Sequence, residues 1–387
     1  MRNVYFDNNA TTMVAPEVVE AMKPFFEQLW GNPSSMHTFG GQIKKHVENA
    51  RRQVASLIGA EPDEIVFTSC GTESDNMAIR GAVEAHDERS HIVTTRVEHT
   101  AVLSVCRHLA NHGCTLTELA VDSHGRLDLD ELKDSLSDDT AVVSIMWANN
   151  ETGVIFPVDE ITKIVKEAGC ILHTDAVQAG GKIPIDVRKT PVDMLSLSGH
   201  KIHAPKGVGA LYIRKGTRVN PLLLGGHQER GKRAGTENVP YIVALGRACE
   251  LAAEHMEEQS VRVEAMRNRL EAGILQTCPD ATVNGDRQHR LPNTLDVGFK
   301  NIEGESILLM LDDLGIAASS GSACTSGSLE PSHVLRAMGV PFTSVHGSIR
   351  FSLSRYNTDD DIDYVLQHIP RIVERLLEIS PFTEKST

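Results

Sequence analysis

The chain has 387 residues, with 38 Lys and Arg against 52 Asp and Glu, which gives a formal net charge of −14. This length suits two domains, or a large α/β domain with a smaller companion. The acidic balance argues against a protein that wraps nucleic acid or an anionic membrane, so we expect a small molecule or another protein as partner.

The first residues, MRNVYFDNNATTMV, lack the apolar core of a signal peptide. No run approaches the roughly 18 apolar residues that a membrane span needs, so we expect a cytoplasmic protein. The cysteines are odd in number and scattered, which in a reducing compartment predicts free thiols rather than disulfides. They are Cys70, Cys106, Cys114, Cys170, Cys249, Cys278 and Cys324.

Short β-branched runs alternate with helical patterns through the first half of the chain. The runs are EIVFTS, HIVTT, TAVVSIMW, CILHTD and VDMLSLS, and the helical patterns include VENARRQVASLIG and VDEITKIVKEAG. This alternation predicts βαβ units and a mainly parallel sheet. Gly59, Gly113 and Gly169 stand where helical patterns stop, as helix C-caps do.

An apolar stripe at helical spacing runs through residues 240–275, which predicts an unusually long helix leaving the first domain. The remaining patterns predict a second, smaller α/β unit. They are the strand PNTLDVGF, the helix ESILLMLDDLG, a Ser/Gly-rich loop, the helix HVLRAMG, the strand SIRFSLS and the helix DDDIDYVLQHIPRIVERLLEI. We expect a large domain over 15–260 and a small domain formed by 1–14 and 261–387.

A phosphate site is indicated where the strand of VFTSCGTESDN runs into Gly71 and Thr72 at the start of a helix. Free backbone N–H groups, a hydroxyl and the helix dipole all favour an anion there. An ordinary βα turn would have the same pattern. The turn is neither a P-loop nor GxGxxG, so a nucleotide is not the obvious ligand.

Two further groups follow strand ends, where α/β proteins bind ligands. Asp175 could be a metal ligand, a general base or the partner of a heterocyclic nitrogen, or it could only cap the next helix. Lys201 could form a Schiff base if burial or a nearby charge lowered its pKa, or it could be ordinary surface, with Lys206 as its rival.

A phosphate cradle, an acid and a lysine at a strand end are together the parts that hold pyridoxal phosphate. His99, in EHTAV after another strand, could stack on the ring and transfer protons. A zinc site is the competing reading, because His108 and His112 are one helical turn apart. No CxxC or HExxH motif supplies further ligands, so we interpret these two as a solvated helix face.

Cys324 lies in SSGSACTSGS, where no neighbour is large enough to form a core around it. Taken alone, it could be an inert thiol in a surface linker, because the sequence does not show a lowered thiol pKa. Glycine and serine would also suit a mobile segment that carries a reactive thiol.

The chain resembles the cysteine desulfurases of the NifS and IscS type, within the fold-type I pyridoxal phosphate enzymes. The resemblance covers nearly the whole chain. The motifs that carry it are YFDNNATT, GNPSSMHTFG, TSCGTESDN, EHTAV, ANNETGVIFP, HTDAVQ, SGHKIHAPKGVG, RAGTEN, SSGSACTSGSLEPSHVLRAMG and SIRFSLS. It implies a large cofactor-binding domain, with a mainly parallel seven-stranded sheet flanked by helices, and a smaller C-terminal α/β domain.

The resemblance also implies roles. Lys201 would be the Schiff-base lysine, Asp175 the partner of the ring nitrogen, and His99 the stacking histidine. Gln178 would donate to the ring oxygen, Asn150 would lie beside cofactor and substrate, and Arg350 would bind the substrate carboxylate. The residues implied to hold the phosphate are Gly71, Thr72, Ser198, His200 and, from the other subunit of an obligate homodimer, Thr236.

In this family the loop cysteine, here Cys324, takes sulfur from L-cysteine as a persulfide while alanine leaves. The acceptor implied is a U-type iron–sulfur scaffold, with which Cys324 can transiently ligate a nascent cluster, and no intrinsic metal is expected. The short C-terminus leans towards the nitrogen-fixation branch. The alternatives are a selenocysteine lyase, an aminotransferase, or a non-catalytic sulfur or metal carrier.

Overall fold

The computed structural model describes residues 2–86, 88–320 and 331–381. Its largest sheet has seven strands in the order β2-β8-β7-β6-β5-β3-β4. The neighbours from β7 to β4 pair in parallel, and β8 alone runs antiparallel to both of its neighbours. The mainly parallel sheet is therefore confirmed. Its strands are β2 (Ile65–Thr68), β3 (His91–Thr95), β4 (Thr115–Leu119), β5 (Thr140–Ser144), β6 (Ile171–Asp175), β7 (Met194–Ser198) and β8 (Gly209–Ile213).

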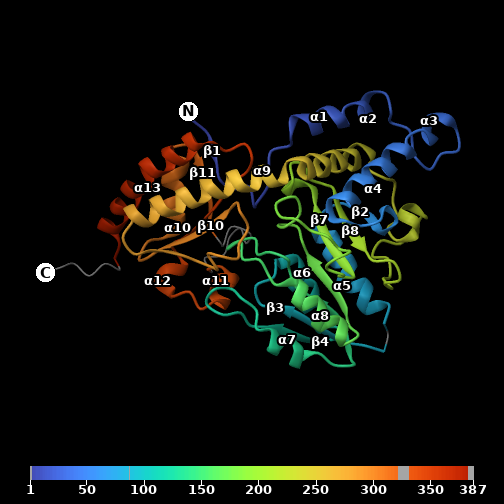
Figure 1. The fold of residues 1–387 in the computed structure, drawn as a ribbon, viewed down its shortest axis with the longest axis horizontal. Coiled ribbons are helices and arrows are strands. Elements are labelled where there is room, and N and C mark those ends of the chain that lie inside the picture. The colour runs from blue at the N-terminus through green and yellow to red at the C-terminus, as the bar shows by residue number, and fades with distance from the viewer. Residues whose placement is uncertain (1, 87, 321–330, 382–387) are drawn as a thin grey trace.

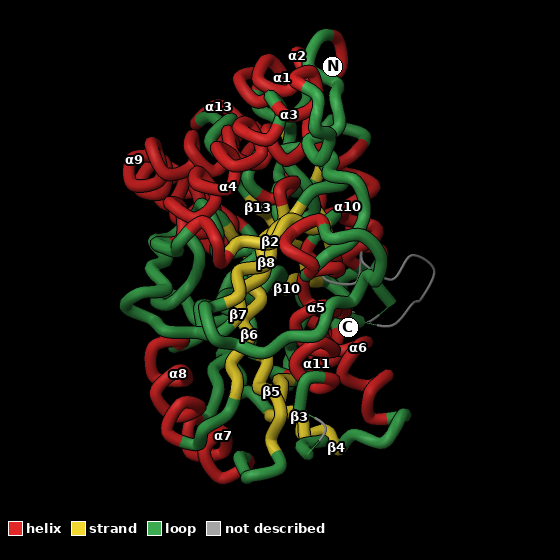
Figure 2. The backbone as a smooth tube through the Cα atoms, turned by 90° about the vertical axis from the view of Figure 1, so that its right-hand side faces the viewer, coloured by secondary structure: helices red, strands yellow, loops and turns green. Residues whose placement is uncertain are grey.

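Helices cover both faces of this sheet, which explains why its central strands are continuous apolar runs. On one face α5 (Gly71–Glu84) and α6 (Thr100–Ala110) share a hydrophobic cluster with the strands. On the other face lie α4 (Lys44–Ile58), α7 (Leu129–Ser135) and α8 (Val158–Glu167), within a larger cluster. Figure 2 shows the two helical layers with the strands between them.

The predicted long helix is present as α9 (Val239–Thr277), which has 39 residues and a proline in its first turn. Its first half packs on α4 so closely that a Cβ on Gly246 would lie 2.6 Å from the Cα of Ala50. Its second half belongs to another hydrophobic cluster, together with α13 (Asp359–Ile379). Figure 1 shows α9 connecting the two parts of the molecule.

The second part contains a four-stranded sheet in the order β12-β13-β10-β9 and a two-stranded parallel pair of β1 with β11. Val4 and Phe6 from the start of the chain are buried in the same cluster as α13. This packing supports the domain division at 1–14 and 261–387, which remains a prediction. The strands are β1 (Val4–Tyr5), β9 (Ala281–Val283), β10 (Thr294–Phe299), β11 (Ile316–Ala317), β12 (Ser319–Ser320) and β13 (Ser348–Ser352).

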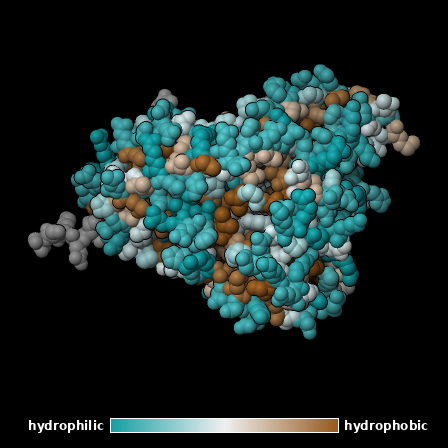
Figure 3. Space-filling model, viewed as in Figure 1, coloured by the Kyte–Doolittle hydropathy of each residue, from teal (hydrophilic) through white to brown (hydrophobic). Residues whose placement is uncertain are grey.

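Shorter elements complete the described chain. The α-helices are α1 (Pro16–Met22), α2 (Pro24–Glu27), α3 (Thr38–Gly41), α10 (Gly304–Asp312), α11 (His333–Ala337) and α12 (Phe342–Val345). Three short 3₁₀ turns are η1 (Pro62–Glu64), η2 (Gly199–Lys201) and η3 (Gln228–Gly231). Among the described residues, the helices lack a segment both long and apolar enough to span a bilayer. Figure 3 shows apolar residues from the centre to the lower middle of this face, with smaller apolar areas at the left and upper right of a mainly polar surface.

Candidate active site

The carboxyl ends of β3, β5, β6 and β7 meet at one edge of the seven-stranded sheet, because these strands are parallel. Asp175 is the last residue of β6, and Ser198 is the last residue of β7. Lys201 ends the short turn after β7, and His99 caps the helix after β3. Four of the predicted site residues therefore come to this edge from three strands.

Asp175 is 7% exposed, and one of its carboxylate oxygens accepts the backbone N–H of Val177 at 2.8 Å. Residues 177–182 form turns and not a helix, so the helix-capping alternative is wrong for Asp175, and the contact with Val177 uses only one oxygen. Burial raises the pKa of Asp175, while the nearby His99 and Lys201 act to lower it. A cationic ring nitrogen beside this buried carboxylate would favour its charged form.

The Lys201 ammonium donates to the backbone carbonyls of Asn9 and, at 2.9 Å, Ala10. The same N-terminal segment contacts His200, whose Nδ1 lies 3.2 Å from the Thr11 hydroxyl. Thr12 donates its backbone N–H to the His200 carbonyl at 3.0 Å. Residues 9–12 therefore form a wall over the turn that contains Lys201, whereas its rival Lys206 is exposed.

His99 stands at the N-cap of α6, where its Nδ1 accepts the backbone N–H of Ala101 at 3.1 Å. Burial lowers the pKa of His99, and the nearby charges of Lys201 and His333 lower it further, against the opposite effect of Asp175. A neutral ring with Nδ1 as acceptor carries its proton on Nε2. His99 is therefore set up to exchange a proton through Nε2.

Three of the predicted phosphate-binding residues, Gly71, Thr72 and Ser198, lie at the start of α5. A Cβ on Gly71 would lie 2.9 Å from Val177 Cγ2 and 3.5 Å from Ser198 Cβ, so only glycine leaves room there. Thr72 is exposed and lines an open hollow of about 800 Å³ together with His99. Burial, helped by Lys201 and Lys206, lowers the pKa of His200 to about 4, so its ring is neutral.

Arg350 and Asn150 meet at the side of this site. One Arg350 Nη donates to the Asn150 carbonyl at 3.0 Å, and the other donates to Asp7 at 2.8 Å. The Asn150 Oδ1 and the Arg350 Nε are buried without a hydrogen-bond partner among the described residues. Unsatisfied buried polar atoms are costly, which suggests that a ligand completes them.

Gln178 is 5% exposed, and its Nε2 donates to the Asn9 carbonyl at 2.9 Å, beside Lys201. Thr236 is different, because it is exposed on the segment before α9 and no described hydrogen bond joins it to another predicted site residue. Cys324 lies outside the described residues. The six described cysteines are free thiols.

A buried polar network beneath the site was not predicted. The Asp75 carboxylate, 1% exposed, lies 3.6 Å from His173 Nε2, which also lies 2.9 Å from the Ser196 hydroxyl. Burial lowers the pKa of His173 to about 3, while burial and the charge of Asp175 raise the pKa of Asp75. In the sequence, the only feature that could have indicated this network was Asp75, an acid among the residues that α5 buries.

Of the competing zinc ligands, His108 is exposed on α6 and His112 is exposed in the turn after it, with the His112 Nδ1 2.7 Å from the His108 carbonyl. Within the described ranges, groups of three or more His, Cys, Asp or Glu able to hold a metal are not found.

The donor set fits the expected cofactor, pyridoxal phosphate. Gly71 begins α5 in close contact with Val177 and Ser198, and the N-terminus of this helix suits a phosphate. The buried Asp175 suits a protonated ring nitrogen, and the Asn150 Oδ1 and Arg350 Nε still lack partners. The site therefore has complementary groups for an anionic ligand with a basic ring.

Comparison with known proteins agrees with this geometry. The aminotransferase class-V family model matches residues 4–365. The chain is 62% identical over 382 residues to a cysteine desulfurase of Nostoc sp., covering 99% of this chain and 96% of that protein. It is 58% identical over 383 residues to the cysteine desulfurase NifS of Azotobacter vinelandii, covering 99% and 95%. 

Solved structures are similar as well. A NifS-like protein superimposes with a TM-score of 0.92 at 43% identity, covering 97% of this chain and 100% of that one. A structure described as SspA in complex with cysteine has a TM-score of 0.81 at 35% identity, covering 92% and 100%.

Proposed function

This chain belongs to the class-V aminotransferase family and is a pyridoxal-phosphate-dependent cysteine desulfurase, and we propose that its own Lys201, His99 and Cys324 carry the reaction. The observation that carries the proposal is the meeting of Lys201, Asp175 and His99, from three separate strand ends, at one edge of the sheet. The solved SspA complex with cysteine supports L-cysteine as substrate.

When bound, pyridoxal phosphate supplies an electron sink that stabilises negative charge at the substrate Cα. Lys201 would tether it covalently, and Asp175 would keep its ring nitrogen protonated. Gly71, Thr72, Ser198 and His200 would hold the phosphate, with Thr236 of a second subunit. Gln178 would donate its free amide N–H to the ring oxygen.

The substrate carboxylate would bind to Arg350, whose Nε lacks a partner among the described residues, with Asn150 beside it, since the Asn150 carbonyl accepts another N–H of the same guanidinium. Arginine suits this role because its planar fork matches a carboxylate. His99, with its proton on Nε2, would exchange protons with the substrate.

Cys324 would be the sulfur acceptor. Its thiolate attacks the substrate sulfur, the carbon–sulfur bond breaks, and a sulfur–sulfur bond forms on the enzyme. The carbon that loses sulfur gains a proton, so that L-cysteine and a thiol become L-alanine and a persulfide. The persulfide would then pass to a U-type scaffold for iron–sulfur assembly, where Cys324 could transiently ligate the cluster.

A homodimer in the cytoplasm is part of this proposal. The exposed position of Thr236, on the segment before α9, supports a role in a second subunit. A nitrogen-fixation role is supported by the similarity to the NifS protein of Azotobacter vinelandii. The domain division at residue 260 is supported by the two hydrophobic clusters that α9 joins.

Alanine and sulfide release from L-cysteine tests the function, with Lys201→Ala and Lys206→Ala compared at equal concentration. Lys201→Ala should lose both the covalently held cofactor and turnover, whereas the exposed Lys206 should be replaceable with little effect on turnover. A wild-type protein that releases alanine only from selenocysteine would show a selenocysteine lyase. A folded protein that binds no cofactor would favour a sulfur carrier.

A further inference from the structure

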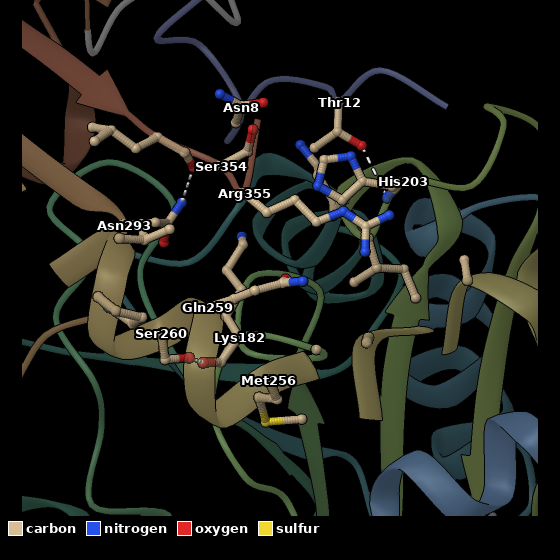
Figure 4. A pocket seen from close by; sticks show the side chains of 18 residues that line it. Asn8, Thr12, Lys182, His203, Met256, Gln259, Ser260, Asn293, Ser354 and Arg355 are labelled. Atoms are coloured by element: carbon tan, nitrogen blue, oxygen red, sulfur yellow. Dashed lines mark hydrogen bonds between the residues drawn. The ribbon is translucent and has the colours of Figure 1, made fainter. Parts of the chain in front are cut away.

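A second lysine stands behind the proposed cofactor site. Lys182 lines a cavity of about 600 Å³ between α9 and the turn that contains Lys201, together with Met256, Gln259 and Arg355. Figure 4 shows the Lys182 side chain pointing into this cavity, near Gln259. The Ser260 hydroxyl donates to the Lys182 carbonyl at 2.7 Å, which ties this backbone to α9.

The Lys182 ammonium donates to the Gln178 Oε1 at 2.8 Å. Lys182 is half-buried, and within the described part of the chain no ion pair joins it to a carboxylate, so the Gln178 oxygen is the acceptor that its ammonium uses. On the opposite side, the Gln178 Nε2 donates to the Asn9 carbonyl at 2.9 Å. Gln178 therefore stands between a donor and an acceptor.

These two neighbours determine which way the Gln178 amide faces. An ammonium can only donate a hydrogen bond, and a backbone carbonyl can only accept one. The amide oxygen must therefore face Lys182, and the amide nitrogen must face Asn9 and Lys201. The second N–H of Nε2 is left for a ligand at the Lys201 side. A flipped amide would place its N–H groups against the Lys182 ammonium and its oxygen against the Asn9 carbonyl, donor against donor and acceptor against acceptor.

We propose that Lys182 is a positioning residue that fixes the Gln178 amide with its N–H donors towards the cofactor's ring oxygen. The inference rests on the proposed function, because it takes Gln178 as a cofactor-binding residue. Lys182 acts here through Gln178 and touches neither cofactor nor substrate. It differs from Lys201, which contacts the wall formed by residues 9–12 directly.

The charges around Lys182 agree with this role. Burial, together with the charges of Lys201 and Arg350, lowers the pKa of Lys182 to about 7. His200 and His203 also face it, and Lys182 in turn lowers the pKa of each. Lys182 lines this cavity and a second one beside α9. The remaining charged residues of the two linings are Arg355, Glu257, Glu264 and Arg290. The ammonium is therefore lost just above neutral pH, where the amide would be less firmly oriented.

A double-mutant cycle tests the proposal through cofactor affinity, measured by equilibrium dialysis of the apoprotein against pyridoxal phosphate. Lys182→Met should weaken affinity about tenfold, equivalent to about 1.4 kcal/mol. In a Gln178→Leu background the same change should cost less than about twofold, because the amide it orients is gone. An equal loss in both backgrounds would overturn the proposal in favour of a direct electrostatic effect.

Two controls keep the result interpretable. Lys189→Met removes a lysine whose side chain is 85% exposed, and it should leave affinity unchanged. If Lys182→Met fails to fold, Lys182→Arg keeps a donor-only side chain and should retain affinity within about threefold, whereas a tenfold loss there would count against the proposal. A wild-type protein that binds the cofactor but releases no alanine would overturn the proposed function, while the cycle would still decide the role of Lys182.

Discussion

The Arg350 guanidinium donates to the Asp7 carboxylate at 2.8 Å, which joins β13 to the segment after β1 across 343 residues. The Arg350 side chain is 5% exposed, and its Nε is still without a partner among the described residues. Asp7 therefore holds the guanidinium in place through one Nη, and the Nε remains available to a ligand. Such a charge-assisted pair orients an arginine without using all of its donors.

Arg350→Lys should raise the KM for L-cysteine by about 10- to 100-fold, as expected for loss of roughly 1.5–3 kcal/mol from a charged hydrogen bond. Lysine keeps the charge but not the planar fork. Steady-state alanine release measures the effect. Arg375→Lys, at an exposed site on α13, is the matched control and should leave KM unchanged. An unaltered KM in Arg350→Lys would remove this residue from substrate binding.

His99→Gln should lower kcat by about 10²- to 10⁴-fold, because an amide cannot exchange protons as an imidazole does. The His99→Gln protein should still hold close to one pyridoxal phosphate molecule per chain, measured after release in alkali, because Lys201 tethers the cofactor. His108→Gln, on the exposed face of the same helix, should behave as the wild type does. Equal kcat values for the two variants would exclude His99 as the acid–base group.

Gly71→Ala should weaken cofactor affinity about tenfold, because its new Cβ would lie 2.9 Å from Val177 Cγ2 and the neighbours must move. Gly41→Ala is the control, since the nearest atom to its added Cβ would be 3.6 Å away. Equilibrium dialysis of both apoproteins gives the comparison. Full affinity in Gly71→Ala would show that this close approach does not shape the phosphate site.

Glu98 should make the folded protein less stable as pH rises. It is fully buried, and burial raises its pKa from 4.5 to about 8, so the folded state holds a proton that the unfolded state loses. This contribution is complete below about pH 4.5 and is lost as pH rises towards about 8. In urea unfolding at pH 6 and pH 8, Glu98→Gln should show a smaller loss of stability than the wild type. The same slope in both proteins would contradict the assigned pKa.

The sequence predicted the elements well because their periodicity is strong. The parallel sheet, the helix α9 and the helix α13 all follow from runs of apolar residues at one clear spacing. The two-residue strands β1 and β11 were not predicted, since two residues cannot show an alternation. Their pairing brings Asp7 to Arg350, and so part of the site depends on an element with almost no sequence signal.

The sequence also gives little indication of the residues that lie behind those at the strand ends. Strand ends and helix starts placed Asp175, Lys201 and His99, because parallel strands bring such positions together. Lys182 and Asp75 lie in ordinary patterns, and their roles depend on which distant groups are buried beside them. Lys201 also donates to the backbone carbonyl of Ala10. Every residue has such a carbonyl, so this contact could not be predicted from residue types.

The central claim is that Cys324 accepts sulfur from L-cysteine activated at Lys201. Mass spectrometry of the Cys324 peptide after one turnover, with Cys324→Ser and Cys70→Ser in parallel, tests it most directly. We predict one added sulfur atom on Cys324 in the wild type and in Cys70→Ser, with neither persulfide nor alanine turnover in Cys324→Ser, which should still retain its cofactor. Sulfur found on Cys70, or wild-type alanine release by Cys324→Ser, would contradict the account.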